Sequence, residues 1–343
     1  MPLSILSRQS ILFVVVVATI ANSACSEEPT RVNDQLSKTA SELPDLPLAI
    51  TSFGADVVGD AMYLYGGHHG RAHHYSNKGQ SGDLLRLDLK KPQRWENVAE
   101  GPNRQGLALI AHADKLYRIG GFEARNAEGE DHDLWSVADC RPFNLKSGKW
   151  EENIPMPTER SSFDAVLVGD AIYVVGGWSM QGEKESVWRD DAYALDVNNI
   201  DAGWKAIAMP PFKRRALCVG TRDGNVYAIA GIQPDGKVTT QTAIFDPTEN
   251  KWSEGPKLPG EDMEGFGPAC CTFDNQLYVS TSSGKLLKLS SDGKSWKPLA
   301  ELPKGRFFHQ MLPLGRKRLV NIAGAHMEEG RFKDVDVVDV KEN

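Results

Sequence analysis

The chain has 343 residues, of which 41% are hydrophobic and 25% are charged, and this composition excludes a wholly disordered protein. The formal net charge is −7 and the basic residues are scattered, which argues against a nucleic-acid partner. The 32 glycines, 19 prolines and 8 tryptophans indicate many short strands joined by turns, so we expect few long helices.

Residues 1–24 have the layout of a secretory signal peptide. Arg8 precedes an apolar stretch over residues 11–20, and small residues follow up to Ala24. Such a stretch rises only about 15 Å as a helix, which is too short to span a hydrocarbon core of about 30 Å. Asn22 to Ser26 resembles a bacterial lipobox and would place a lipid on Cys25; simple cleavage near Ala24 is the alternative, because Asn22 departs from the usual aliphatic residue. We therefore expect export to the periplasm or cell envelope, with membrane contact only through such a lipid.

A pattern of about fifty residues recurs six times in the rest of the chain. Each copy has a tyrosine or valine shortly before a pair of small residues, which is Gly-Gly in the first three copies. The six segments span residues 63–67, 117–121, 173–177, 227–231, 278–282 and 320–324. The third copy predicts a first strand over residues 163–168, a turn at Gly169 and Asp170, and a second strand over residues 171–175.

Further marks follow each strand pair in the same order. Five copies have a tryptophan, at Trp95, Trp150, Trp204, Trp252 and Trp296, and each is followed by a proline. An arginine then stands before the next copy at Arg104, Arg160, Arg214 and Arg306, whereas Gly265 occupies that place in the fifth copy. We expect the tryptophans to fill the widening space between neighbouring sheets.

These marks resemble the kelch repeat over residues from about 43 to 340. The resemblance implies an all-β fold, a six-bladed β-propeller of four strands per blade, occupying residues 43–343. A single four-stranded sheet cannot bury both of its faces, so the sheets must stack against one another.

The sixth copy ends before its outer strand, since only four residues follow Asp339. An open ring would leave an unpaired sheet edge. We expect the segment over residues 36–43, at the end of a polar tether spanning residues 25–42, to pair with residues 335–340 and close the ring. Deletion of the first 43 residues should then lower the melting temperature or cause association.

Alternation of strand direction places the loops after the glycine pairs and the loops with the arginines on one face. We expect an anionic carbohydrate or an acidic protein segment to bind at this mouth of the propeller, because guanidinium groups donate paired hydrogen bonds to carboxylates. The alternative is that the kelch arginines bond backbone carbonyls of the adjacent blade. The expected ligand-binding residues are Arg104, Arg160, Arg214, Arg306, His68, Trp178 and His326.

Four histidines, His68, His69, His73 and His74, stand close together in one loop. Imidazoles at this density can bind zinc or copper. No thiolate or carboxylate set accompanies them, so we expect a solvated loop, no metal and no cofactor.

Two enzyme classes share the kelch architecture. Galactose-oxidase-like enzymes need a cysteine joined to a tyrosine at the mouth, whereas the cysteines here lie in or near the expected blade strands and none is adjacent in motif to a mouth tyrosine. Sialic-acid mutarotases match better in size, export and arginine content, and Glu264 or Glu123 could act as their general base. We expect a monomeric binding module for a ligand or a protein, with sugar mutarotase or epimerase activity as the alternative.

The cysteines are too few for a disulfide framework. A bridge between the strands that carry Cys218 and Cys271 is one hypothesis. Buried free thiols at Cys140, Cys218, Cys270 and Cys271 are the other.

Overall fold

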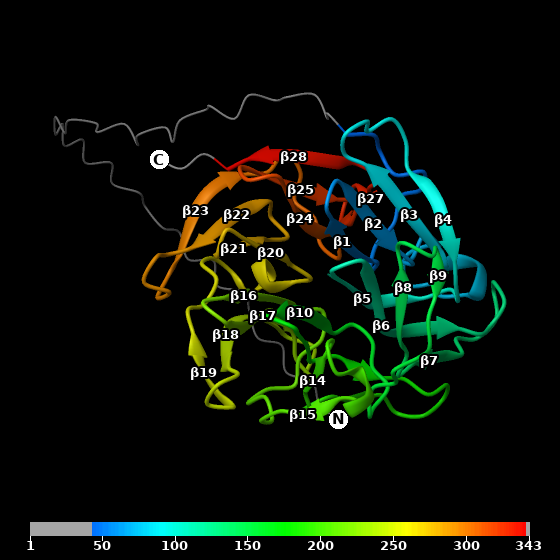
Figure 1. Cartoon of the computed structure of the whole chain (residues 1–343), viewed down its shortest axis with the longest axis horizontal. Helices are drawn as coiled ribbons and strands as arrows, with labels where there is room; N and C mark the ends of the chain where they lie inside the picture. Colours follow the sequence, from blue (N-terminus) through cyan, green and yellow to red (C-terminus); the bar gives the residue numbers. More distant parts are fainter. Residues whose placement is uncertain (1–42, 341–343) are drawn as a thin grey trace, which may run out of the picture. The chain divides into compact units, whose positions relative to one another are not determined.

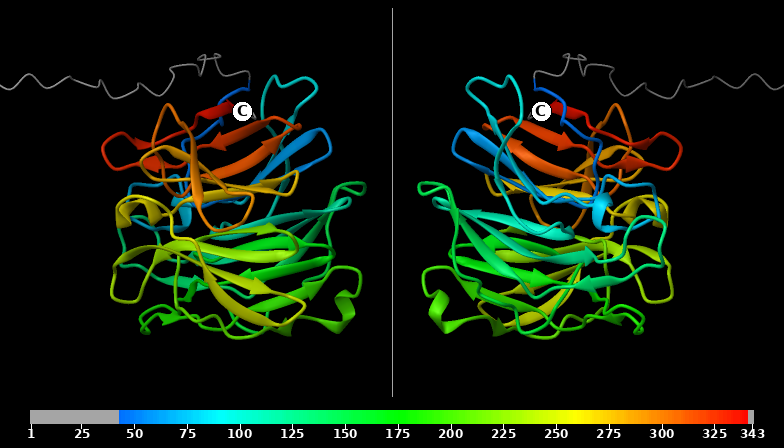
Figure 2. Two further views of the ribbon diagram at one scale, coloured as in Figure 1. Left: turned by 90° about the vertical axis from the view of Figure 1, so that its left-hand side faces the viewer. Right: turned by 90° about the vertical axis from the view of Figure 1, so that its right-hand side faces the viewer.

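The protein is a six-bladed β-propeller, as the repeat predicted. The structure is a computed structural model that describes residues 43–340, and all of them belong to one compact unit. Figure 1 shows the sheets following one another round a ring, from blue through green and yellow to red, so that the last blade returns beside the first. Figure 2 shows the same ring from two sides.

Blades I to III comprise the first three sheets. Blade I contains β1 (Gly54–Val58), β2 (Ala61–Tyr65), β3 (Asp83–Asp88) and β4 (Glu96–Glu100). Blade II contains β5 (Gln105–His112), β6 (Lys115–Ala124), β8 (Cys140–Asn144) and β9 (Lys149–Trp150), with β7 (Leu134–Ser136) paired to β6. Blade III contains β10 (Asp164–Val168), β11 (Ala171–Val175), β14 (Tyr193–Asp196) and β15 (Lys205–Ala206), with a small hairpin of β12 (Trp178–Ser179) and β13 (Val187–Trp188).

Blades IV to VI complete the ring. Blade IV contains β16 (Cys218–Arg222), β17 (Asn225–Ile232), β18 (Val238–Asp246) and β19 (Lys251–Gly255). Blade V contains β20 (Ala269–Phe273), β21 (Gln276–Ser280), β22 (Lys285–Leu289) and β23 (Trp296–Glu301). Blade VI has three strands within the described residues, β24 (Gln310–Leu314), β25 (Arg318–Ile322) and β28 (Val335–Asp339), with a hairpin of β26 (Ala325–His326) and β27 (Gly330–Arg331). Three short 3-10 segments are present in the same range, at Asn77–Gly79, Ile200–Ala202 and Asp262–Gly265.

The first strand of each blade lies nearest the axis, and the tyrosine–glycine strand comes second. β1, β5, β10, β16, β20 and β24 line a central channel of about 270 Å³. The predicted turn at Gly169 and Asp170 is confirmed, because Val168 pairs with Ala171. The corresponding turn of the last blade is longer, since Leu314 pairs with Arg318 and the turn has three residues instead of two.

Backbone hydrogen bonds join five of the six pairs of neighbouring blades at one end of the channel, all except blades IV and V, within the described residues. Each blade has a residue with positive φ shortly before its first strand or, in blade II, as the second residue of that strand. These six residues, which we call the collar, are Ser52, Gly106, Ser162, Ala216, Gly267 and Phe308. The Ser52 amide donates to the Phe308 carbonyl at 3.0 Å, and the Gly106 amide donates to the Ser52 carbonyl at 2.7 Å. Equivalent bonds join Ser162 to Gly106, Ala216 to Ser162 and Phe308 to Gly267.

The first described residues pack between blades VI and I. Leu43, Leu46, Ile50 and Phe53 are buried there with β25 and β28 side chains. The Leu46 amide donates to the Lys333 carbonyl at 2.9 Å. The closing strand predicted over residues 36–43 lies, except for Leu43, outside the described residues and stays a prediction.

Tryptophans join each of blades I to V to the segment before it, and they lie between sheets as predicted. The indole of Trp95 donates to the Pro44 carbonyl, that of Trp150 to Glu100, and that of Trp204 to Ile154. Trp252 and Trp296 repeat the contact with the carbonyls of Ala208 and Pro256. Each indole therefore ties its blade to the part of the chain that comes shortly before that blade.

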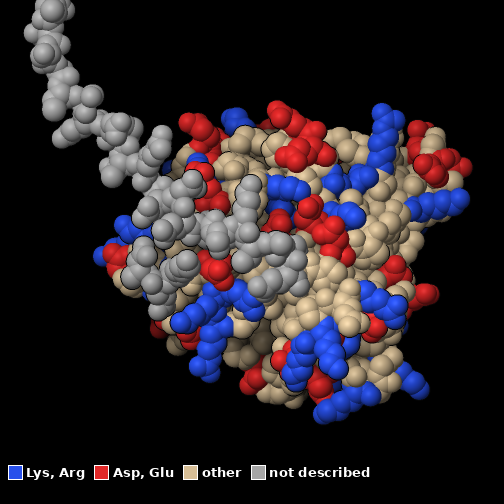
Figure 3. All heavy atoms as spheres, turned by 90° about the horizontal axis from the view of Figure 1, so that it is seen from above, with Lys and Arg blue, Asp and Glu red and all other residues tan. Residues whose placement is uncertain are grey.

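The outer surface carries both signs of charge. Figure 3 shows Lys and Arg interspersed with Asp and Glu on the side that it presents. Many of these groups form pairs, such as Lys90 with Asp60 at 2.7 Å and Lys115 with Glu151 at 2.7 Å. No helix in residues 43–340 is long and apolar enough to cross a bilayer.

Candidate functional site

A pocket of about 250 Å³ lies at the collar end of the channel. All six blades contribute to it, because every collar residue and its neighbours in the first strands line the wall. Loops between second and third strands add Tyr75, Trp178 and Met180, while β6 adds Phe122 and β7 adds Leu134. The loops after the glycine pairs and the loops between blades therefore meet on one face, as strand alternation predicted.

Arg215 is the arginine of this pocket. Its guanidinium lies over the Trp178 ring at 4.3 Å from the centroid and over Trp188 at 5.6 Å. Its Nε is buried without a hydrogen-bond partner. The two terminal nitrogens form no ion pair with a carboxylate of the described residues, and they are not buried polar atoms that lack a partner. Burial lowers the pKa of Arg215, but an arginine keeps its charge in proteins. The Arg215 side chain is therefore a cation that lies against aromatic rings and has N–H groups free to donate hydrogen bonds to a ligand.

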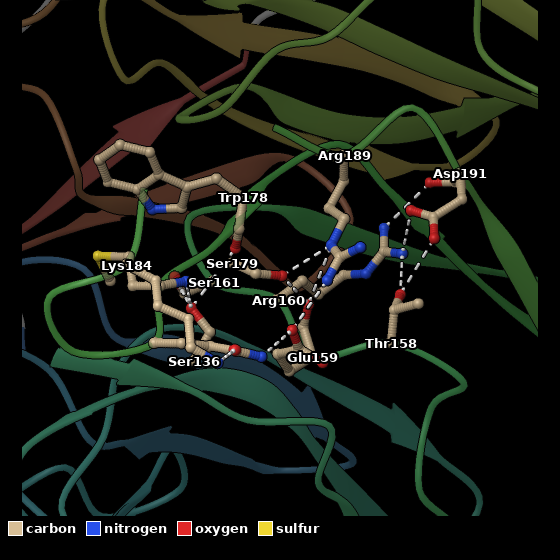
Figure 4. A network of polar contacts seen from close by, with 12 residues as sticks. Ser136, Thr158, Glu159, Arg160, Ser161, Trp178, Ser179, Lys184, Arg189 and Asp191 are labelled. Carbon is tan, nitrogen blue, oxygen red and sulfur yellow. Dashed lines mark hydrogen bonds and ion pairs between the residues drawn. The ribbon is translucent and has the colours of Figure 1, made fainter. Parts of the chain in front are cut away.

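A polar network holds Trp178 in place (Figure 4). The hydroxyls of Ser136 and Ser161 are 2.9 Å apart, and the Met180 amide donates to Ser136 Oγ at 3.0 Å. Next to Trp178, the Ser179 hydroxyl donates to the Glu159 carbonyl and accepts a hydrogen bond of 2.7 Å from Arg189 Nε. Because β12 is fixed on both sides, the indole presents a stable surface to Arg215.

Tyr75 reaches the pocket from the long loop of blade I. Its amide donates to His132 Nε2 at 3.1 Å, and its carbonyl accepts a hydrogen bond of 2.7 Å from Asn126 Nδ2. Its ring contacts those of His68 and Phe122 at centroid distances of 5.2 and 5.8 Å. The loops of blades I and II are therefore joined where they border the pocket.

Asp164 lies at the boundary between the pocket and the channel. One carboxylate oxygen accepts the Ala165 amide at 2.9 Å and the other accepts the Val219 amide of blade IV at 2.7 Å. Burial raises the pKa of Asp164 to about 7, against the effect of these two hydrogen bonds. The group can therefore exchange a proton near neutral pH.

The four arginines expected at the mouth are instead buried within the blades. Arg160, with no exposed surface, donates to the Gly176 carbonyl, to Asp191 at 2.7 Å and to Thr158. Arg306 pairs with Asp336, Arg104 pairs with Glu123 at 2.6 Å, and Arg214 donates to the Gln241 carbonyl. None of the four lines the pocket, and the ligand-binding role expected for them has no supporting contact.

The backbone of these arginines explains their repeated spacing. The second glycine of each pair donates its amide to the arginine carbonyl of the next blade, as Gly67 does to Arg104 at 2.7 Å and Gly177 to Arg214 at 2.7 Å. A side chain on Gly66 would meet the Arg104 carbonyl oxygen at 2.6 Å. The arginine and the glycine pair are therefore two halves of one contact between blades.

The predicted histidines do not come together. His68 is buried and donates from Nε2 to the His74 carbonyl at 3.3 Å, and burial lowers its pKa to about 4. His73 and His74 are exposed and His69 is half-buried. Within residues 43–340 no group of three metal-ligating side chains is gathered.

Of the remaining predicted residues, Trp178 lines the central pocket, whereas Glu123, Glu264 and His326 do not. Glu123 pairs with Arg104 and with Arg125 at 2.5 Å, and Glu264 pairs with Lys285 and accepts a hydrogen bond from Ser283 at 2.7 Å. These contacts, outweighing burial, lower the pKa of both carboxyls, so neither is suited to act as a base near pH 7. His326 lines a separate cavity of about 180 Å³ with Glu264, whereas Trp178 lines the central pocket.

Fold and site together define a β-propeller with a ligand-sized central pocket. Residues 52–284 match the model of the KLHDC2/KLHL20/DRC7 Kelch-repeats domain. The chain belongs to the kelch-repeat family.

Relatives of two kinds are similar to the chain. The N-acetylneuraminate epimerase of Haemophilus influenzae (strain 86-028NP) is 26% identical over 284 residues, which are 78% of this chain and 64% of that protein. Kelch-like protein 36 of Bos taurus is 24% identical over 213 residues, 61% of this chain and 33% of that protein. The chain thus spans less than two thirds of the first relative and about one third of the second.

A solved structure agrees in fold. "Structure of YjhT" superimposes with a TM-score of 0.70 over 88% of this chain and 98% of that chain, at 17% sequence identity. The similarity concerns the arrangement of the blades.

Proposed function

We propose that the protein binds a small anionic carbohydrate in the central pocket. The observation that carries this proposal is Arg215, whose guanidinium lies against Trp178 and Trp188 without a carboxylate partner in the described residues. A buried or half-buried cation is ordinarily paired, so an unpaired one at a pocket suits an anionic ligand.

The rest of the pocket supports a sugar acid over an acidic peptide. The volume of about 250 Å³ lies at the small end of the range for ligand pockets and suits a single sugar ring. Aromatic side chains such as Phe122 and Phe163 offer apolar surface, while Ser52, Gln105 and Gln310 offer polar groups. The similarity to proteins named N-acetylneuraminate epimerase favours the same class of ligand.

Calorimetry with N-acetylneuraminic acid, glucuronic acid and neutral N-acetylglucosamine tests the proposal. We expect the acids to bind more tightly than the neutral sugar, and Arg215→Met to weaken acid binding by about tenfold to a hundredfold, the value of a hydrogen bond to a charged group. Arg71→Ala, which removes an exposed arginine from a blade I loop, is the matched control and should leave binding unchanged. Equal binding of acid and neutral sugars, or an undiminished Arg215→Met variant, would contradict the proposal.

A second candidate function is mutarotation of the bound sugar acid. It is supported by the epimerase relatives and by Asp164, the pocket carboxyl whose pKa lies at about 7. Exchange between the anomers of N-acetylneuraminic acid can be followed by NMR. We expect acceleration by the wild type and its loss in Asp164→Asn with binding retained; unaccelerated exchange in the presence of confirmed binding would leave the binding function alone.

We also propose that the protein is exported and lies in the cell envelope, on the strength of the signal-like residues 1–24 and of Cys25. Cell fractionation and the mass of the mature N-terminus test this. A lipid on Cys25 that disappears in Cys25→Ser would distinguish anchoring from free secretion.

A further inference from the structure

Two cysteines face each other across the boundary between blades IV and V. Cys218 begins β16 and Cys270 is the second residue of β20, and these strands lie side by side in the inner ring. Three residues beyond Cys218 the two strands are joined twice, because Thr272 Oγ1 accepts the Thr221 amide at 3.1 Å and donates to the Thr221 carbonyl at 2.7 Å. The strands therefore cannot slide or separate locally beside the cysteines.

The side chains share one apolar cluster. Cys218 is buried in the core between blades IV and V, and Cys270 packs against that core. The Cys218 thiol is the main cause, ahead of burial, of the raised pKa of the Cys270 thiol, so the two side chains are close neighbours. Cys271 points the other way, as strand alternation requires, and is buried with Met311 between blades V and VI. The partner of Cys218 is thus Cys270 and not Cys271, which corrects the bridge considered from the sequence.

Small molecules can reach this pair from the pocket. Cys218 and Cys270 both line the central pocket, and Cys270 also lines the channel below it. Cys140, by contrast, has no exposed surface and lies in the core between blades II and III. Accessibility therefore separates the pair from Cys140, while Cys271 lines the channel but not the pocket.

We propose that Cys218 and Cys270 are a site of disulfide formation that joins blades IV and V at the floor of the pocket. The two thiols are free in the structure. In the reaction each thiol loses one hydrogen and the pair gives two electrons to a small disulfide, such as oxidised glutathione, which becomes two thiols while one sulfur–sulfur bond breaks and one forms. The proposal does not depend on which ligand the pocket binds.

The bridge would close a loop over residues 218–270, which contains all four strands of blade IV. Because cross-links over long loops restrict the unfolded chain most, the oxidised protein should be the more stable form. It would also fix the two inner strands that carry the lower wall of the pocket.

The test treats the folded full-length protein with oxidised glutathione at pH 8.5, because the Cys218 thiol and burial raise the pKa of Cys270. We expect a loss of two hydrogens in the intact mass, a linked peptide pair containing Cys218 and Cys270, and a melting temperature several degrees higher that returns on reduction. Cys218→Ser and Cys270→Ser should abolish all three effects. Cys140→Ser and Cys271→Ser are matched controls, each removing one buried cysteine elsewhere, and should preserve them.

Three results would overturn the proposal. These are a folded protein that keeps all its thiols while urea-unfolded protein oxidises, a linked pair that contains Cys271, and a mixed disulfide with glutathione that persists on one cysteine. The readout is covalent mass, so it remains decisive even if no sugar acid binds.

Discussion

At the scale of single residues, the kelch arginines have a structural role that residue type alone does not reveal. Their spacing was interpreted as a cationic mouth, whereas the structure buries them and bonds their guanidinium groups to carboxylates and backbone carbonyls. The spacing could not predict their carboxylate partners. Asp191, which pairs with Arg160, and Asp336, which pairs with Arg306, each lie about thirty residues further along the chain. Arg215 stands directly after the repeat position occupied by Arg214, and this extra arginine was the one available signal for the pocket cation.

Replacement of a buried arginine should destabilise the fold. Arg160→Ala removes the guanidinium that donates to the Asp191 carboxylate and the Gly176 carbonyl, while Thr158 and Tyr193 still donate to Asp191. We expect the free energy of unfolding to fall by on the order of 3 kcal/mol, because one partner of a buried ion pair is lost. Urea unfolding measures this.

Arg94→Ala is the control for that substitution. Its side chain is 81% exposed and pairs loosely with Glu96 at 3.6 Å. A change of less than about 0.5 kcal/mol is expected there. Similar losses at both positions would show that burial of Arg160 contributes nothing to stability.

At the scale of strands and loops, the sequence predicted the blades well and the mouth poorly. Strands β10 and β11 fall where the third copy predicted them, because alternating apolar residues and a tight turn determine a hairpin locally. The sequence did not predict the short strand pairs β12–β13 and β26–β27 or the additional strand β7. Two-residue strands leave no periodic pattern, and their place depends on contacts with other blades, such as the bridge between Trp135 and Gln181.

The segment before β1 should be necessary for the contact between blades VI and I. Leu46 is 2% exposed in that core, whereas Leu48, two residues later, is 50% exposed. We expect Leu46→Ala to lower the free energy of unfolding by about 2–5 kcal/mol, the cost of a cavity in a packed core. Chemical denaturation of Leu46→Ala and Leu48→Ala gives the comparison, and equal effects would contradict the role of this segment in closing the ring.

At the scale of the whole molecule, buried carboxylates connect neighbouring blades around the axis. Asp56 of blade I accepts the Ala111 amide of blade II at 2.6 Å, and Asp164 of blade III accepts the Val219 amide of blade IV. Burial raises their pKa values to about 6 and about 7. An aspartate in the unfolded chain titrates near pH 4, so the folded protein binds more protons between about pH 4 and 7. The contribution of these groups to stability is therefore present at low pH and decreases as the pH rises through 6 and 7.

Replacement of Asp164 by asparagine should remove its share of this dependence. His68 and His309 titrate in the opposite sense, because burial lowers their pKa, so the informative quantity is the difference between variant and wild type. We expect the free energy of unfolding of Asp164→Asn, relative to wild type, to increase by on the order of 3 kcal/mol from pH 5 to pH 8, because the folded pKa of Asp164 is about 7. Urea titrations across this range measure it.

Asp60→Asn, at an exposed hairpin turn, is the control, and its difference from wild type should stay nearly constant over the same range. If the free energy difference between Asp164→Asn and wild type did not change with pH, the Asp164 carboxyl would have the same pKa in the folded and unfolded chains.

The indole contacts that join successive blades also bear on synthesis. Because a chain leaves the ribosome or an export channel N-terminus first, Trp95 can bond to the Pro44 carbonyl as soon as the first sheet has emerged, and each later tryptophan can do the same with the chain before its blade. The blades would then fold one after another from the N-terminal end, each packing against the blade before it. Only the seam between Ser52 and Phe308 must wait until translation is almost finished.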